Sequence, residues 1–206
     1  RECWGGLDLA STRDLSSFVL FFPMDNGKFV VLPHFFIPRD TIYTRVMKDK
    51  VPYNEWERAG LMNISEGDVQ DYEVIRIKVN ELREKYNIVS VAFDRWNSSS
   101  LVVNLANDGL ALSPFGQGFA SMSSPTKELE KMILNKDINH LNNPILRWQM
   151  SNVSLRTDPA ENIKPDKAKS SEKIDGVVAM IMALGEWLTD DSEGESVYND
   201  RGLISL

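Results

Sequence analysis

Three aspartates that each stand alone in an apolar run are the strongest constraint on how this chain can fold. They are Asp8 within residues 4–10, Asp94 at the end of residues 88–94, and Asp175 near the start of residues 174–181. A carboxylate inside an apolar core is costly unless it is paired, hydrogen-bonded or bound to metal. Three such carboxylates from distant parts of one chain are the pattern expected of a divalent-metal site for phosphoryl transfer.

Length and hydrophobic content favour a single domain. The chain has 206 residues, of which 42% are hydrophobic, and this is enough to bury one sizeable core. Its formal net charge is −7, whereas proteins that grip nucleic acid by bulk electrostatics carry a basic face. Any contact with DNA must therefore be local.

The sequence lacks the residues needed for disulfides, for histidine-based metal sites and for a P-loop. Cys3 is the only cysteine, no apolar run reaches transmembrane length, and the first residues lack a signal-peptide pattern, so we expect an intracellular protein without disulfides. The two histidines, His34 and His140, are too few and too scattered for a His-based zinc site or a His-Asn-His nuclease site. The P-loop motif is absent from the sequence.

The first part of the chain is typical of an antiparallel meander. Residues 4–10, about 16–23 and 28–36 are three short runs rich in β-forming residues, and the turn signal at 25–27 joins the second run to the third. From residue 38 to about 60 the pattern becomes helical but irregular. We interpret this stretch as an insertion packed at the edge of the sheet.

The middle of the chain alternates helices with strands. Ser65 and Asp68 have the spacing of a capping box, so we expect an amphipathic helix to open there and to lead into a strand at 88–94. A short helix at 98–107 and a strand at 110–115 follow. Ser124 and Pro125 then indicate the start of another helix, because serine favours the cap and proline the first turn.

The last third is irregular until its final helix. Residues 153–165 alternate enough for a hairpin, although two prolines limit it to edge positions. A helix at about 172–188 is apolar on nearly all sides and should be buried against the sheet. We therefore expect a domain over residues 1–188 and an acidic, disordered tail over 189–206.

This order of elements is that of a ribonuclease H-like α/β fold. We expect a central mixed sheet of five or more strands flanked by helices. Strands 4–10, 88–94 and 110–115 should be parallel neighbours, because Asp8 and Asp94 need adjacent strands to share an ion.

Several short motifs resemble the nuclease domain of tailed-phage terminase large subunits. They are residues 6–11 (GLDLAS), 64–68 (ISEGD), 93–97 (FDRWN), 162–165 (NIKP) and 169–179 (KSSEKIDGVVA). The resemblance spans residues 4–188. It implies a metal-dependent endonuclease domain that cuts duplex DNA during phage DNA packaging, with Asp8, Asp94 and Asp175 as its catalytic acids. Because the family places an ATPase domain before the nuclease, this chain looks like an excised nuclease half of the packaging motor.

The chemistry of such a site needs two hard divalent ions. Two Mg²⁺ or Mn²⁺ ions about 3.5–4 Å apart activate a water and stabilise the leaving 3′ oxygen of a phosphodiester. We expect Asp8, at the centre of the sheet, to bridge both ions, and Asp94 and Asp175 each to complete one. Whether Glu66 adds a further ligand stays open.

Basic residues close to the predicted acids are candidates for DNA binding. Lys164, Lys167, Lys169 and Lys173 crowd one short loop, and Arg95 follows Asp94 directly. Acidic neighbours balance the lysines in part, so a solvated loop and a phosphate clamp are both open interpretations.

The resemblance also implies partners and a location. The partners are double-stranded DNA, the ATPase domain of the same large subunit, the terminase small subunit and the capsid portal, with no membrane. The location is the cytoplasm of the infected host cell, and transiently the procapsid.

Two other functions are compatible with parts of the sequence. Residues 6–12 also resemble the first phosphate motif of actin-like ATPases and sugar kinases, but those proteins need a second lobe and further glycine-rich loops, for which this sequence has no matching glycine clusters. The second alternative is a non-catalytic module of the same fold that docks DNA or a portal. Retention of all three acids argues against it. A junction resolvase or transposase would fit the acids but not the acidic character of the chain.

Overall fold

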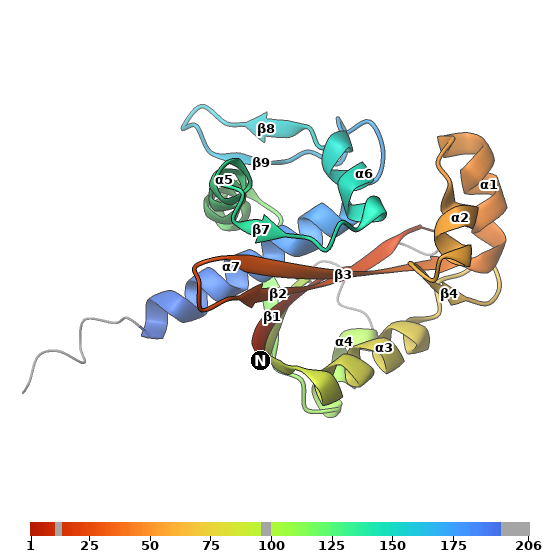
Figure 1. The fold of residues 1–206 in the computed structure, drawn as a ribbon, viewed down its shortest axis with the longest axis horizontal. Helices are drawn as coiled ribbons and strands as arrows, with labels where there is room; N and C mark the ends of the chain where they lie inside the picture. Colours follow the sequence, from red (N-terminus) through yellow and green to blue (C-terminus); the bar gives the residue numbers. More distant parts are fainter. Residues whose placement is uncertain (11–13, 96–99, 195–206) are drawn as a thin grey trace, which may run out of the picture.

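A mixed seven-stranded sheet forms the centre of the structure, a computed structural model that describes residues 1–10, 14–95 and 100–194. The strands follow the order β4-β3-β2-β1-β5-β6, and β7 also pairs with β3 (Figure 1). Their bounds are β1 Glu2–Asp8, β2 Ser16–Pro23, β3 Phe29–Pro38, β4 Asn63–Ser65, β5 Asn87–Asp94, β6 Leu112–Phe115 and β7 Ile138–Asn139.

The pairing of the strands confirms the predicted topology. Strands β1, β2 and β3 form an antiparallel meander, while β1, β5 and β6 are parallel neighbours. Leu7 of β1 lies opposite Phe93 of β5. Asp8 and Asp94 are the next residues of these two strands, so both lie at the carboxyl ends of adjacent strands. Since neighbouring strands lie about 4.8 Å apart, these two acids are close enough in the backbone to serve one site.

Two very short strands enlarge the sheet beyond the five strands that the sequence pattern outlined. Strands β4 and β7 both pair with β3 in parallel, so the meander is not the edge of the sheet. Strands of two or three residues are too short to show a periodic pattern, which is why the sequence does not indicate them.

Helices cover both faces of this sheet. In Figure 1, α5, α6 and α7 lie on one face, α3 and α4 lie on the other, and α1 and α2 follow the end of β3. No helix in the described ranges combines the length and hydrophobicity needed to cross a membrane. The helix bounds are α1 Arg39–Asp49, α2 Tyr53–Arg58, α3 Tyr72–Lys85, α4 Ser100–Asn107, α5 Phe119–Leu134, α6 Pro144–Asn152 and α7 Asp175–Gly194.

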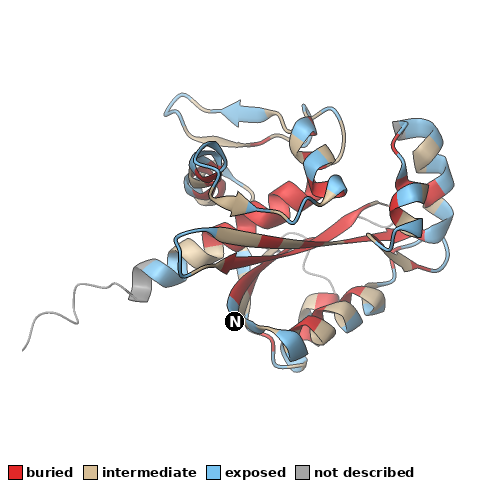
Figure 2. Cartoon of the chain, in the orientation of Figure 1, coloured by how far each residue is buried: buried red, intermediate tan, exposed pale blue. Residues whose placement is uncertain are grey.

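Helix α7 is the central helix of the core. Its residues 177–184 are all buried, as are most of β1 and β2 beneath it (Figure 2). At Gly6 of β1 the helix comes so close that an added Cβ would lie 1.9 Å from the carbonyl oxygen of Ala179. A side chain at position 6 would therefore push the helix off the sheet. The predicted burial of this helix is confirmed.

The last helix is longer than expected. It continues to Gly194, so residues 189–194, which we assigned to a disordered tail, are helical. The indole Nε1 of Trp4 donates a hydrogen bond to Asp190 Oδ2 at 3.2 Å, and this contact ties the extension to β1. The remainder of the expected tail, residues 195–206, lies outside the described residues.

Two predicted helix starts are wrong. Ser65 is buried in β4, where it pairs with Pro38, and α3 begins only at Tyr72, with Asp71 accepting the backbone N–H of Glu73 at 2.9 Å. The sheet pairing of Ser65 overrides its capping spacing. In the same way α5 begins at Phe119, six residues before Pro125.

Burial accounts for the position of Pro125 inside α5. A proline in a helix removes one backbone hydrogen bond. The Pro125 ring is buried where α5 faces α7, and its Cγ lies 3.3 Å from the point where a Cβ on Gly185 would be. Pro125, which we took to mark the start of a helix, is instead a packing residue between α5 and α7.

The hairpin predicted over 153–165 is present as a separate two-stranded sheet. Strands β8, Leu155–Thr157, and β9, Ile163–Pro165, pair antiparallel with Arg156 opposite Lys164. The hairpin does not join the edge of the main sheet.

Asp14, in the segment between β1 and β2, ties this segment to two other parts of the chain. It pairs with Arg45 of α1 at 2.9 Å and with Lys173 just before α7, and it accepts the backbone N–H of Leu15 at 2.8 Å. Burial by itself would raise the pKa of Asp14, but the hydrogen bonds and the two cations outweigh it and hold this pKa below its usual range. These contacts make Asp14 a structural residue of this segment.

Replacing Gly6 by alanine should lower the free energy of unfolding by about 3 kcal/mol or more, because overpacking against a helix backbone cannot be relieved by a rotamer change. Urea denaturation measures this loss. Gly118→Ala is the matched control, because its φ is −84° and a Cβ there meets no atom within 4 Å. Equal losses in the two variants would contradict the proposed contact between β1 and α7.

Asp14→Asn should lower the free energy of unfolding by roughly 2 kcal/mol at pH 7, as expected for lost charged hydrogen bonds. Because the folded-state pKa is lowered, the stabilisation is fully present above the unfolded pKa of about 4 and is lost as the pH falls through the folded value. Wild type and variant should therefore converge below pH 4 in melts across a pH series. The control Asp25→Asn alters a carboxylate that is 92% exposed and should change little at any pH.

Candidate active site

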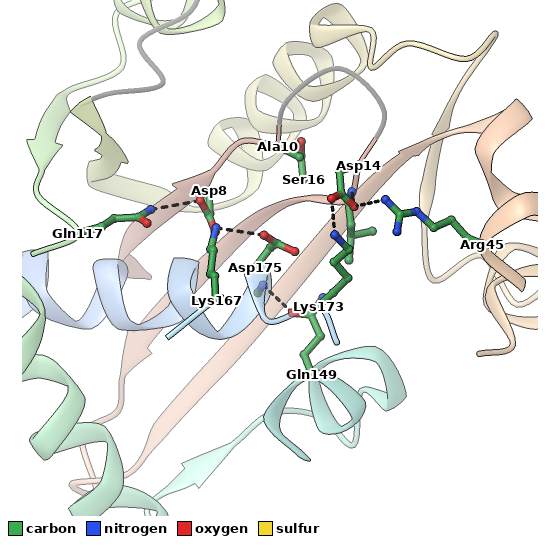
Figure 3. Close-up of polar contacts among 12 residues, drawn as sticks. Asp8, Ala10, Asp14, Ser16, Arg45, Gln117, Gln149, Lys167, Lys173 and Asp175 are labelled. Atoms are coloured by element: carbon green, nitrogen blue, oxygen red, sulfur yellow. Dashed lines mark hydrogen bonds and ion pairs between the residues drawn. The ribbon is translucent and has the colours of Figure 1, made fainter. Parts of the chain in front are cut away.

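Two of the three predicted acids meet at one end of the sheet. Asp8 is the last residue of β1 and is 1% exposed, and Asp175 is the first residue of α7 and is 8% exposed. Lys167 lies between them in the segment that joins β9 to α7. Its Nζ donates to Asp8 Oδ2 at 2.6 Å and to Asp175 Oδ1 at 3.1 Å (Figure 3).

Two glutamines support this carboxylate pair. Gln117 Nε2 donates to Asp8 Oδ1 at 3.3 Å, and Gln149 Oε1 accepts the backbone N–H of Gly176 at 2.6 Å, which holds the first turn of α7 (Figure 3). The other oxygen of Asp175, Oδ2, is buried and has no hydrogen-bond partner among the described residues. The sequence does not single out either glutamine, because each acts from a different element and no short motif contains it.

Burial and neighbouring charges shift the pKa values of Asp8 and Lys167. Loss of water raises the pKa of Asp8 to about 6, since the attraction of Lys167 offsets the cost of burial only in part and the neighbouring Asp175 adds to the rise. Burial would lower the pKa of Lys167, but the two carboxylates outweigh it and hold that pKa above its usual range.

The third acid, Asp94, stands on the neighbouring strand. It ends β5, next to Asp8 along the ladder and opposite Phe115 of β6, and it is half-buried. Within the described ranges there is no group of three or more His, Cys, Asp or Glu side chains that could hold a metal ion. The structure thus brings Asp8 and Asp175 together around a lysine and places Asp94 beside them without completing a cage of three acids.

The lysines that crowd one loop in the sequence have separate contacts in the structure. Lys164 Nζ donates to the Gln117 carbonyl at 2.8 Å and lies 5.5 Å from the centre of the Phe119 ring. Lys173 binds Asp14, and Lys167 binds the two acids. Lys169 is exposed and contributes its backbone to the hydrogen bonds of the loop. Only a tertiary structure can separate these roles, because neighbouring loop residues point in different directions.

Arg95 and Glu66 are the two remaining candidates. Arg95 is exposed directly after Asp94. Glu66 pairs with Arg39 of α1 at 3.1 Å, and it does not join the Asp8 and Asp175 pair.

Two pockets open beside Lys167. One of 460 Å³ is lined by Asp14, Lys167, Lys173 and Asp175 among others. A second, of 210 Å³, is lined by Gln117, Arg156, Lys164 and Lys167 among others. Arg156 of β8 is a cation near the site that the sequence analysis did not identify, because its proximity depends on the pairing of β8 with β9.

Comparison with known proteins gives one consistent family. The family model described as "Terminase large subunit, endonuclease domain" matches residues 1–191. The "Terminase, large subunit" of Enterobacteria phage HK97 is 35% identical over 187 residues, which is 90% of this chain and 37% of that protein. This chain therefore spans well under half of that relative.

Solved structures agree with this assignment. The crystal structure of the HK97 large terminase superposes with a TM-score of 0.85 at 34% identity, over 90% of this chain and 39% of the other. The large terminase nuclease of thermophilic phage G20c, in structures with bound magnesium and with bound cobalt, shares the fold with TM-scores of 0.57 and 0.56 at 13% and 12% identity, over 89% and 90% of this chain and 80% and 81% of those chains. The chain belongs to the family of terminase large-subunit endonuclease domains.

Proposed function

We propose that this chain is a metal-dependent endonuclease that hydrolyses phosphodiester bonds of duplex DNA. The observation that carries the proposal is the convergence of buried Asp8 and Asp175 at the end of β1, beside Asp94 on β5, in a chain of this family. Family membership removes the actin-like alternative. The non-catalytic docking module stays an alternative that activity must decide.

The residues at the site fit divalent metal. Carboxylate oxygens are the ligands that Mg²⁺ and Mn²⁺ prefer, and the pair already attracts a cation in the form of the Lys167 ammonium. Asp175 Oδ2 is buried without a partner and can accept a further one. We propose that Asp8, Asp94 and Asp175 hold two ions, which when bound activate the attacking water and stabilise the leaving oxygen. The G20c relatives with magnesium and cobalt support divalent ions for this family.

Residues around the acids hold them in place. Gln117 orients Asp8, and the hydrogen bond from Gly176 to Gln149 fixes the start of α7 and with it Asp175. A Cβ on Gly176 would lie 2.7 Å from both Gln149 Oε1 and Phe35 Cε1, so a larger residue here would force one of these buried side chains to move. The carboxylates are thus positioned by packed elements and not by a loose loop, as a catalytic site needs.

DNA binding depends on a few local cations, because the chain as a whole is acidic. We propose Lys164, Lys167, Lys169 and Arg95 as phosphate contacts, together with Arg156 beside Lys164. Lys173 is bound to Asp14, so its contribution to DNA binding requires that pair to open.

The partners and location of the whole protein are part of the same proposal. They are an ATPase domain of the same large subunit, the terminase small subunit and the capsid portal, in the cytoplasm of the infected host and transiently at the procapsid. The relatives are terminase large subunits of greater length, and this supports the assignment.

Asp175→Asn should reduce plasmid cleavage in Mg²⁺ or Mn²⁺ by orders of magnitude, because the variant keeps the shape of the side chain but loses a charged ligand. Its melting temperature in chelator should stay near wild type, since Lys167 keeps its contact with Asp8. Asp25→Asn, which alters an exposed carboxylate in the turn between β2 and β3, is the charge-matched control and should cut DNA normally. A folded Asp175→Asn protein with wild-type cleavage would support the docking module instead.

Replacing Lys164 and Lys169 together by alanine should weaken duplex binding in chelator and reduce the slope of log affinity against log salt concentration by about 1 to 2, as for the loss of two phosphate contacts. Fluorescence anisotropy over a salt series measures both effects. Lys48 and Lys136 lie on other parts of the surface, and their double alanine variant is the control for net charge. If the two double variants had the same slope of log affinity against log salt concentration, Lys164 and Lys169 would not be part of the DNA interface.

A further inference from the structure

Lys167 occupies the position of a cation in the carboxylate pair. Its ammonium contacts one oxygen of each acid, at 2.6 Å from Asp8 and 3.1 Å from Asp175. Both carboxylates are almost completely buried, so a charge left there without a partner would be strongly destabilising. A metal ion held by the same two carboxylates would place a second cation close to the ammonium. The lysine and a metal ion on Asp8 and Asp175 are therefore competitors.

Hydrogen bonds hold the backbone on both sides of Lys167. Asp166 donates its backbone N–H to the Ser154 carbonyl at 2.8 Å, and its Oδ1 accepts the N–H of Ala168 at 3.0 Å. The N–H of Ser170 donates to the Asp166 carbonyl at 2.9 Å. These hydrogen bonds hold the loop in place, so Lys167 can change its contacts by moving its side chain alone.

The side chain of Lys167 has room to move. It is 43% exposed although its ammonium contacts buried carboxylates. It also lines both pockets at the site, the one beside Asp175 and the one beside Lys164 and Arg156. The lysine stem of four carbons is flexible, so the ammonium can turn toward either pocket.

We propose that Lys167 is a resident cation that closes the carboxylate pair when metal is absent and turns outward to a DNA phosphate when metal enters. This inference rests on the proposed function, because it assumes that Asp8 and Asp175 bind metal. A DNA phosphate that binds Lys167 then favours metal binding, because the ammonium no longer contacts the carboxylates. A bound metal ion favours DNA binding, because it releases the ammonium. The two ligands assist each other, and the coupling is reciprocal.

The lysine should stabilise the metal-free protein. Lys167→Met removes the ammonium but keeps the apolar stem, and in chelator it should melt roughly 5 °C or more below wild type, because two buried carboxylates lose their counter-charge. Lys169→Met makes the same charge change in the same loop and should melt at the wild-type temperature. Equal melting temperatures for Lys167→Met and wild type would overturn the inference.

The decisive measurement is the affinity for Mn²⁺ without DNA, by isothermal titration calorimetry. Lys167→Met and the more conservative Lys167→Gln should bind Mn²⁺ about tenfold or more tightly than wild type, because the competing cation is gone. Lys169→Met should match wild type. A lysine that only positions the acids for metal would give the opposite result, with unchanged or weaker affinity in both Lys167 variants, and that result would overturn the inference.

DNA provides the second arm of the test. A short duplex with a cleavage-resistant phosphorothioate backbone should tighten Mn²⁺ binding to wild type about fivefold or more, and the factor should be smaller in Lys167→Met. An equal factor in both proteins would overturn the role of Lys167 in the coupling.

Asp175→Asn separates this inference from the proposed function. If Asp175→Asn loses Mn²⁺ binding but Lys167→Met binds Mn²⁺ no more tightly than wild type, the proposed metal site stands. Only the proposed competition between Lys167 and the metal ion is then overturned. Absence of Mn²⁺ binding by wild type would overturn both.

Discussion

The close approach of α7 to β1 determines where the chemistry of this protein lies. Because position 6 carries no side chain, the helix backbone rests on the strand at Ala179, and the buried stretch 177–184 fills the core above the sheet. The first residue of that helix is then held at the end of the same strand. Asp175 meets Asp8 as a consequence of helix packing, although the two residues are far apart in sequence.

Charge balance is the second condition on the site. Two buried carboxylates at one point repel each other, and in this structure the Lys167 ammonium between them offsets that repulsion. The loop from β9 to α7 therefore contributes to stability as well as to the site. Asp94 stands beside this pair, at the end of the adjacent strand β5.

Much of the fold was predictable because long elements carry periodic patterns. The meander, the parallel order of β1, β5 and β6 and the buried last helix follow from runs of apolar residues with clear turns between them. The errors fell where local signals compete with tertiary contacts. Ser65 has a capping spacing but pairs in β4, and Pro125 marks a helix contact and not a helix start. Strands β4 and β7 are too short for any pattern to show.

The sequence by itself determined which acids are candidates and which family the chain resembles, because a lone aspartate in an apolar run is visible without coordinates. It also determined that DNA contacts must be few, from the net charge of −7. Only the tertiary structure decided what each basic residue contacts: Lys167 faces the acids, Lys173 faces Asp14, and Lys164 lies over Phe119 beside Arg156 of the facing strand. The physical reason is that side-chain direction in a loop has no period, so it is set by the distant residues that the fold brings within hydrogen-bonding distance.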